Sequence, residues 1–302
     1  MLAIDPITLD YTSLDYSSAV DDPAWLIGTT YALDAVVSVD ALRYKSLIAG
    51  NVGYAPATSP LQWLLLGPTN KMAMFDTSPT SVTRVTSGNL QVRFTPASRV
   101  TAVGLLLVIG SRTTLRIYES KAAFDAGAAW LYDVPQSMAT SDGTYYSWCF
   151  EPLQQRPDVS FLSLPSVGVG TYFVLTIEPA GGVAECGLCA FGRQYDLGTA
   201  EYGFAQSAEL RGRSYFDSAG NPVRLDRGYR KNISGTLVVP KVNYNRVQNF
   251  LQERIGVPML WILSPTLADY RSAIMFGDYE RTNLVIDNSV SNSLDVEING
   301  YY

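Results

Sequence analysis

Histidine is absent from this chain of 302 residues. Its absence excludes Ser-His-Asp and Cys-His catalysis, a histidine general base, and any zinc site that needs a histidine ligand. Charged residues are also scarce, because Asp, Glu, Lys and Arg make up 17% of the sequence and the 22 basic ones form no block. A nucleic-acid groove needs a positive stripe, and the net charge here is −6, so we expect no nucleic-acid partner.

Long hydrophobic runs are missing as well. The longest is Val103–Ile109 (VGLLLVI), far shorter than the roughly 20 residues of a membrane-spanning helix, so we expect no membrane insertion. The N-terminal sequence MLAIDPITLDYTS has no positive charge and no apolar stretch of the signal-peptide kind. These features predict a protein that is made in a cytoplasm and remains there or joins a larger assembly.

Cysteine is limited to Cys149, Cys186 and Cys189, the last two in a CxxC spacing. A zinc knuckle would need a second pair, and a redox motif would need a strand followed by a helix. On a strand, residues three apart point to opposite faces, which argues against joint ligation. We therefore predict structural thiols and no metal or other cofactor, with metal or redox chemistry as the alternative.

The sequence is otherwise rich in core-forming residues, since 47% of it is apolar and 12% is aromatic. Its length suggests two or three domains. Changes of pattern divide the chain into an extended N-terminal arm at residues 1–23, a small β module at 24–69, a β-rich domain at 70–192 and an α+β domain at 193–302. The predicted fold class is mainly β.

The N-terminal arm contains a near-repeat, Leu-Asp-Tyr, that ends at Tyr11 and again at Tyr16. Its spacing fits neither a helix nor a strand, and Pro6 and Pro23 flank it. One interpretation is a segment ordered against another chain, with Tyr11 and Tyr16 as an assembly interface. The other is an arm packed on its own domain, and the pattern does not choose between them.

The β-rich domain shows strands of similar length separated by Gly, Pro and Asp-Gly turns, which predicts a β-sandwich or jelly roll. The expected strands are Leu90–Phe94, Gly104–Ile109, Thr113–Tyr118, Tyr145–Phe150 and Gly170–Glu178, with a short helical turn in Ser120–Gly127 and a turn at Asp142-Gly143. Their order is similar to that of galactose-binding-like jelly rolls. Alternation in the fourth strand would place Tyr146, Trp148 and Phe150 on one face, and one face of this strand is a candidate ligand surface.

The C-terminal domain contains one convincing amphipathic helix, Lys241–Ile255, followed by Gly256. Its apolar face is expected to comprise Val242, Val247, Phe250, Leu251 and Ile255. Strands are expected at Ser234–Val239, Pro258–Leu263, Asn283–Ile286 and Ser293–Ile298. The only local excess of basic residues, Arg211, Arg213, Arg224, Arg227, Arg230 and Lys231, is interleaved with acids and predicts a salt-bridged surface or subunit contact.

The small module carries an ordered series of aromatic and aliphatic positions, Trp25, Tyr31, Val37, Tyr44 and Trp63. This spacing resembles the chitin-binding-type modules of polysaccharide-degrading enzymes and phage tail proteins, although Asp34-Ala35 stands where those modules have Gly-Asp. The continuation GPTNKMAMFD, and the helix-to-strand order of the C-terminal domain, are similar to phage tail-tip and baseplate proteins. The resemblance implies a structural virion protein.

The same resemblance implies a sugar platform formed by Trp25, Tyr31, Tyr44 and Trp63. Flat aromatic rings stack on the C–H faces of sugars, and Asp34, Asn51 and Gln62 could bond to sugar hydroxyls. The alternative is that so small a module needs its large rings to build a core at all.

Together these features predict a non-enzymatic structural protein of a phage tail tip, baseplate or fibre. The expected partners are other tail proteins, further copies of the chain and a host-surface glycan, and the expected location is the virion. One alternative is a polysaccharide hydrolase with an accessory binding module, but nothing selects a catalytic pair among Asp125, Asp133, Asp142, Glu151, Glu178 and Glu185. Another is a pure assembly protein whose module has lost its sugar.

Overall fold

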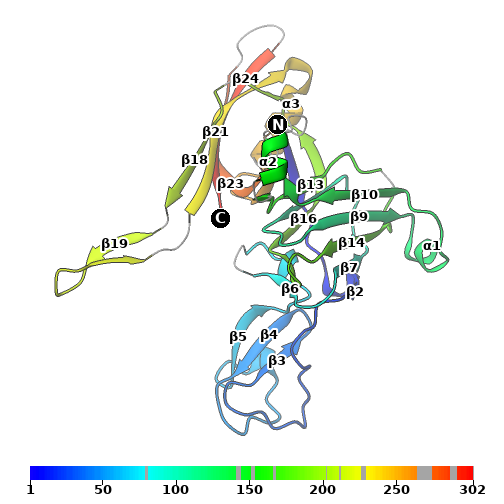
Figure 1. The fold of residues 1–302 in the computed structure, drawn as a ribbon, viewed down its shortest axis with the longest axis vertical. Coiled ribbons are helices and arrows are strands. Elements are labelled where there is room, and N and C mark those ends of the chain that lie inside the picture. Colours follow the sequence, from blue (N-terminus) through cyan, green and yellow to red (C-terminus); the bar gives the residue numbers. More distant parts are fainter. Residues whose placement is uncertain are drawn as a thin grey trace. The chain divides into compact units, whose positions relative to one another are not determined.

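The computed structural model describes residues 1–78, 81–140, 144–150, 154–165, 168–201, 203–210, 212–225, 229–263, 274–285 and 291–301. The chain divides into two compact units. Unit 1 comprises Met1–Pro6 and Arg193–Tyr302, and unit 2 comprises Ile7–Gly192. The prediction of a mainly β fold is confirmed, because antiparallel strands form most of both units (Figure 1). None of the helices in the described ranges is long and apolar enough to span a membrane.

Unit 2 contains a five-stranded antiparallel sheet in the order β10-β9-β14-β7-β2. Its strands are β2 (Leu14–Ser17), β7 (Leu90–Phe94), β9 (Arg112–Tyr118), β10 (Tyr132–Ser137) and β14 (Tyr172–Glu178). In a second set, β8 (Ala102–Leu106) lies between β13 (Val159–Phe161) and β16 (Leu188–Asp196), and β16 continues into unit 1. Unit 2 also contains the small module and two short pairs, β6 (Thr83–Val85) with β15 (Ala184–Cys186), and β11 (Ala139–Thr140) with β12 (Gln154–Gln155).

One hydrophobic core joins these two sets of strands. Alternate residues of β7 are buried, so Phe94 points inward beside Phe173 of β14 and Phe191 of β16. The ring centroids of Phe94 lie 5.5 Å from Phe173 and 5.0 Å from Phe191. Inward side chains of facing strands therefore form a sandwich core, as period-two alternation requires.

The small module is a three-stranded sheet in the order β3-β4-β5, formed by β3 (Val36–Val39), β4 (Leu42–Ser46) and β5 (Trp63–Pro68). The turn between β3 and β4 places Asp40 at a φ of 49°, a left-handed conformation that Asp tolerates better than most residues. Short 3-10 turns follow at η2 (Pro56–Thr58) and η3 (Ala73–Phe75).

The N-terminal segment is not an unpaired arm. Strand β1 (Leu2–Pro6) pairs with β22 in unit 1, and after η1 (Tyr11–Ser13) strand β2 pairs with β7 in unit 2. Of the two interpretations, the structure therefore shows packing on the same chain. The first three residues of β1, Leu2, Ala3 and Ile4, are all buried, so both faces of this strand are covered.

Unit 1 is built on a sheet in the order β1-β22-β23-β24-β21-β17, with β18 also paired to β21. Its strands are β17 (Thr199–Ala200), β18 (Ala205–Leu210), β21 (Tyr229–Pro240), β22 (Met259–Ile262), β23 (Ile274–Val285) and β24 (Ser291–Gly300). A separate hairpin joins β19 (Arg213–Phe216) to β20 (Pro222–Leu225). The predicted strands Ser234–Val239 and Ser293–Ile298 lie within β21 and β24, and the predicted Pro258–Leu263 extends one residue beyond β22 at each end. The predicted Asn283–Ile286 covers only the end of β23, and Ile286 lies outside the described residues.

The predicted amphipathic helix is present as η4 (Lys241–Asn243) followed by α3 (Tyr244–Glu253). Val247, Phe250 and Leu251 are buried, as predicted. Val242 and Ile255 are exposed, so the prediction was wrong for these two residues. They lie beyond the ends of α3, where the chain no longer follows the helical period that would bring them to the buried face.

The segment Tyr145–Phe150 was predicted as a strand but forms helix α2. Aromatic residues favour strands where they can pack on a sheet, whereas Tyr145, Tyr146 and Phe150 are exposed here. In the helix Tyr146 and Phe150 are four residues apart and their rings lie 5.2 Å from each other, so they share a face. The predicted alternation is therefore wrong for these residues, while Asp142-Gly143 and the side chain of Trp148 lie outside the described residues. The predicted helical turn after Tyr118 is present as α1 (Lys121–Asp125).

Candidate functional site

The four predicted platform residues of the small module come together, but as its core. Trp63 is 2% exposed and Tyr44 is 7% exposed, and Val37 lies directly across the strand pair from Tyr44. The ring of Tyr31 meets that of Trp63 edge-on at 5.3 Å, and Trp63 Nε1 donates to the carbonyl of Tyr54 at 2.9 Å. A sugar could therefore reach Trp63 or Tyr44 only if the module opened.

The remaining two rings, Trp25 and Tyr31, are half-buried against this core. The hydroxyl of Tyr31 accepts a hydrogen bond from the backbone N–H of Leu26 at 2.7 Å, and its backbone pairs with Asn51. The polar end of the ring thus fastens a loop of the module itself. Sugar binding at Trp25 and Tyr31 stays a prediction.

Two of the polar side chains predicted to bond to sugar hydroxyls, those of Asp34 and Asn51, form contacts within the module. Asp34 forms an ion pair with Lys45 at 2.6 Å. Asn51 is fully buried, and its side-chain amide donates to Ser46 Oγ at 3.0 Å and to the carbonyl of Gln62 at 3.2 Å. These groups hold loops together, which is what a module with so small a core requires.

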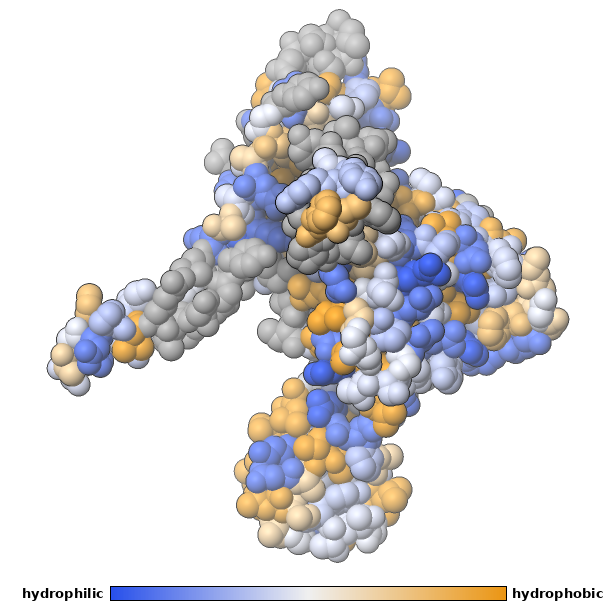
Figure 2. Space-filling model, viewed as in Figure 1, coloured by the Kyte–Doolittle hydropathy of each residue, from blue (hydrophilic) through white to orange (hydrophobic). Residues whose placement is uncertain are grey.

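The outer surface of the small module is strongly apolar. Figure 2 shows many hydrophobic residues on the lobe that contains β3 to β5, with white and blue residues between them. The exposed large apolar side chains of this module are Leu26, Ile27, Leu33, Leu42, Leu47, Ile48, Val52, Tyr54, Leu61, Leu64, Leu65 and Leu66. Its cations Arg43 and Lys45 are both ion-paired, so the surface is nearly without free charge. Exposed apolar side chains in such number on one small module indicate an interaction surface.

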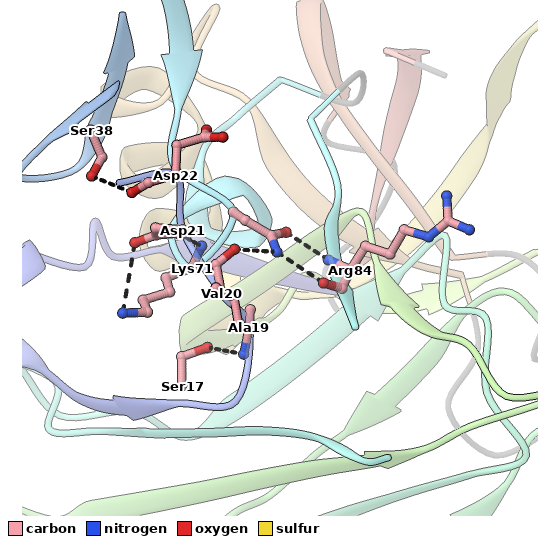
Figure 3. Close-up of polar contacts among 9 residues, drawn as sticks. Ser17, Ala19, Val20, Asp21, Asp22, Ser38, Lys71 and Arg84 are labelled. Atoms are coloured by element: carbon pink, nitrogen blue, oxygen red, sulfur yellow. Dashed lines mark hydrogen bonds and ion pairs between the residues drawn. The ribbon is translucent and has the colours of Figure 1, made fainter. Parts of the chain in front are cut away.

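The chain enters the module through residues 17–22, whose contacts with Lys71 and Ser38 Figure 3 shows, and it leaves the module near residue 70. Asp22 accepts from Arg43 Nε at 2.5 Å, which ties the entering strand to β4. Asn70 donates to the carbonyls of Val20 and Arg84, at 3.1 and 2.9 Å, and accepts from the N–H of Arg84 at 2.8 Å. This one side chain joins the entering segment, the leaving segment and β6.

Two hollows flank the entering segment. The larger, of about 1100 Å³, is lined by Arg43, Asp76 and Arg84 among others. The smaller, of about 500 Å³, is lined by Tyr11 and Tyr16 together with polar residues of the entering segment. The structure therefore places the two tyrosines that were predicted as an assembly interface beside a concave surface, which sequence spacing alone did not indicate.

Asp15, which lies in β2 between Tyr11 and Tyr16, anchors this strand within unit 2. Its carboxylate accepts from the hydroxyl of Tyr172 at 2.6 Å and pairs with Lys121 of α1. Hydrogen bonds from Lys121 and Tyr172 lower the pKa of Asp15, and burial followed by the bond to Asp15 raises the pKa of Tyr172. These contacts fix strand β2 against the five-stranded sheet.

The carboxylates considered for glycoside hydrolysis are used in ion pairs wherever the structure describes their contacts. Asp133 lies 3.2 Å from Arg116, Glu178 lies 3.9 Å from Arg112, and Glu185 lies 3.0 Å from Arg84. Asp125 is exposed on α1, while Asp142 and Glu151 lie outside the described residues. Among the described carboxylates the structure singles out no pair for such chemistry.

Cys186 and Cys189 both lie in the sandwich core, and Cys149 is exposed on α2. Burial raises the pKa of Cys186 to about 12 and also raises the pKa of Cys189. The predicted separation of these two residues on opposite strand faces is wrong, because Gly187 interrupts the strand between β15 and β16. A side chain at Gly187 would strike Leu107, so the interruption depends on glycine.

The basic cluster is described only in part. Arg230 forms an ion pair with Glu209 across β18 and β21 at 2.7 Å. Arg211 and Arg227 lie outside the described residues. The pair that is described is the exposed salt bridge that the sequence predicted, and such pairs contribute little stability.

Comparisons with known proteins add little. No protein-family model matches the chain, and no curated protein matches it. Among solved structures, the chain is similar to the CBM32-1 module of a family 31 glycoside hydrolase from Clostridium perfringens, with 13% sequence identity and a TM-score of 0.25 over 41% of this chain and 84% of that one. A similarity as slight as this carries no argument about function.

Proposed function

We propose that this chain is a structural protein of a phage tail tip, baseplate or fibre, where it joins other tail proteins and further copies of itself. The observation that carries the proposal is the distribution of side chains in the small module. Its aromatic rings form the core, and its aliphatic side chains, such as Leu64 and Leu65, cover the outside.

An apolar, uncharged surface is suited to a protein partner. Burial of apolar surface stabilises a complex by about 25 cal/mol per Å². The same surface left exposed on a free protein promotes aggregation. In a symmetric tail each copy meets neighbours repeatedly, so a modest contact is multiplied around the ring. The spacing of Trp25, Tyr31, Tyr44 and Trp63, which resembles modules in phage tail proteins, supports the same proposal.

The test is incorporation into particles. Particles from the source of the gene are purified on a density gradient, and the chain is quantified by mass spectrometry against a head protein. The proposal expects the chain to band with the particles at several copies for each one. Recovery of the whole chain at the top of the gradient, away from particles, would contradict it.

A matched pair of variants assigns the contact to the module. Leu65→Lys introduces a charge at a side chain that is 53% exposed on β5, and we expect it to reduce incorporation strongly while the protein still folds. Val169→Lys introduces the same charge at a residue that is 76% exposed outside the module, and incorporation should be unchanged. Equal incorporation of both variants would remove the module from the assembly contact.

A further inference from the structure

The smaller hollow beside the entering segment has the dimensions of a ligand site. Its volume of about 500 Å³ lies within the range of roughly 300–1,000 Å³ that is typical of small-molecule sites. Its walls include Tyr11 from η1, Tyr16 from β2, and Asp21 and Lys71 from the two chain segments that connect the module. This hollow is separate from the aromatic core of the small module.

The ring of Tyr16 and the backbone of Tyr11 are held in place before any ligand arrives. Tyr16 pairs with Arg93 in the β2–β7 ladder, and the guanidinium of Arg93 lies over the Tyr16 ring at 4.6 Å from its centroid. A cation on one face fixes the ring, and Tyr16 remains 43% exposed. Tyr11 begins a 3-10 turn that Asp10 caps through the N–H of Thr12. A ring held as Tyr16 is loses little conformational entropy when a ligand stacks on it.

The polar part of the lining combines a hydrogen-bond acceptor, the Asp21 carboxylate, with a donor, the Lys71 ammonium, and their charges cancel. Asp21 Oδ1 accepts from the backbone N–H of Lys71 at 2.9 Å, which fixes the carboxylate. Its second oxygen lies 3.8 Å from Lys71 Nζ, too far for a direct hydrogen bond. Asp22, which also lines the hollow, is neutralised by Arg43. The lining therefore disfavours a strongly charged ligand and can still accept and donate hydrogen bonds.

From this combination we infer that the smaller hollow binds a neutral saccharide. One face of a pyranose ring stacks on a tyrosine, because aromatic rings match the apolar C–H face of a sugar. Adjacent hydroxyls, approaching from the hollow, then donate to Asp21 and accept from Lys71, whose charged groups lie 3.8 Å apart. The inference does not depend on the proposed role in a tail, because a chain that never enters a particle would still bind the sugar.

The test uses the full-length chain and a panel of neutral monosaccharides: galactose, N-acetylgalactosamine, glucose, N-acetylglucosamine and rhamnose. Saturation-transfer NMR detects which of them bind, and calorimetric titration measures the affinity. We expect at least one to bind with a dissociation constant of about 0.1–10 mM. Glucuronate, which adds a negative charge near Asp21, should bind more weakly than glucose.

Variants locate the site. Tyr11→Ala and Tyr16→Ala should each weaken binding at least about tenfold, and Tyr145→Ala, at an exposed tyrosine on α2, should leave it unchanged. Thermal melts establish that each variant is folded. If Tyr16→Ala fails to fold, Lys71→Met replaces it and should also weaken sugar binding. This change removes the ammonium group but keeps the backbone N–H that donates to Asp21.

The inference is overturned if the folded protein binds none of the neutral sugars, or if binding survives both tyrosine changes. It is also overturned if binding is lost in Trp25→Ala instead, because the site would then lie in the small module. None of these results affects incorporation into particles, so failure of the saccharide site and failure of the assembly role can be told apart.

Discussion

Trp63 makes the contacts of a core residue: an edge-on contact with Tyr31, a hydrogen bond to the carbonyl of Tyr54 and nearly complete burial. The residue types of the module were sufficient to predict that its rings lie together. They could not decide whether the rings face inward, because core formation and sugar stacking use the same residue types. The loops around the rings determine how deeply the rings are buried. The conformation of these loops depends on contacts such as the hydrogen bond from the Asn51 amide to Ser46 Oγ.

At the residue scale, the cysteines give a direct test of burial. Cys149 is exposed, whereas Cys186 and Cys189 are buried with raised pKa values and so remain protonated near neutral pH. We expect a thiol reagent to modify one cysteine in the native protein and all three after denaturation. Rapid modification of three thiols before unfolding would show that the sandwich core is open.

A second residue-scale prediction concerns pH and Asp15. The pKa of Asp15 is lowered in the folded state, so its contribution to stability is present above the ordinary pKa of about 4 and is lost as the pH falls through the lowered value. Asp15→Asn should therefore reduce the free energy of unfolding at pH 7 by about 1.5–3 kcal/mol, the range for a hydrogen bond to a charged group.

Thermal unfolding of both proteins between pH 3 and pH 7 checks this prediction. The difference between Asp15→Asn and the unaltered chain should shrink steadily below about pH 4. A constant difference across this interval would mean that the charge of Asp15 does not contribute, and that the change acts only through packing.

At the scale of elements, strands and helices were predicted correctly where the local pattern of apolar residues was strong. Strands β7, β9 and β14 were predicted because their apolar residues alternate or run continuously between turns. Strand β8 was predicted too far toward its C-terminal end, since Leu107 adopts a φ of 54° and stops it, which no propensity for leucine indicates. Helix α2 was missed because its aromatic residues favour strands only where a sheet is available to pack on.

Strand β23 gives a prediction at this scale. A side chain at Gly277 would overlap the carbonyl oxygen of Asn299 on the neighbouring strand β24. Gly277→Ala should therefore lower the free energy of unfolding by at least about 1–3 kcal/mol, because the backbone must move apart. Gly28→Ala, where an added methyl group meets no atom within 4 Å, serves as the control and should change stability little. Chemical denaturation measures both, and equal stability of the two variants would contradict the packing of β23 on β24.

At the scale of the whole molecule, one of the two units is built from both ends of the chain. Met1–Pro6 belongs to the C-terminal unit, where Ala3 pairs with Trp261 and Asp5 forms an ion pair with Arg254 at 3.0 Å. Pairing across more than 250 residues leaves no local trace in a sequence. A pattern-based division into an arm followed by domains could not have found it.

This arrangement predicts how fragments behave. Residues 193–302 alone lack β1, so the buried edge of β22 is exposed, and we expect this fragment to aggregate. The same fragment with residues 1–7 attached through a flexible linker should be monomeric. Size-exclusion chromatography and circular dichroism compare the two, and a monomeric, fully structured fragment without β1 would show that this strand is dispensable.

The central claim is that the chain is a structural part of a phage tail, and localisation on particles tests it most directly. Antibodies raised against the purified full-length protein are applied to intact particles and located by immunogold electron microscopy. We predict gold at the tail tip, baseplate or fibres, at several sites on each particle. Particles that carry no label, or label confined to heads, would contradict the claim.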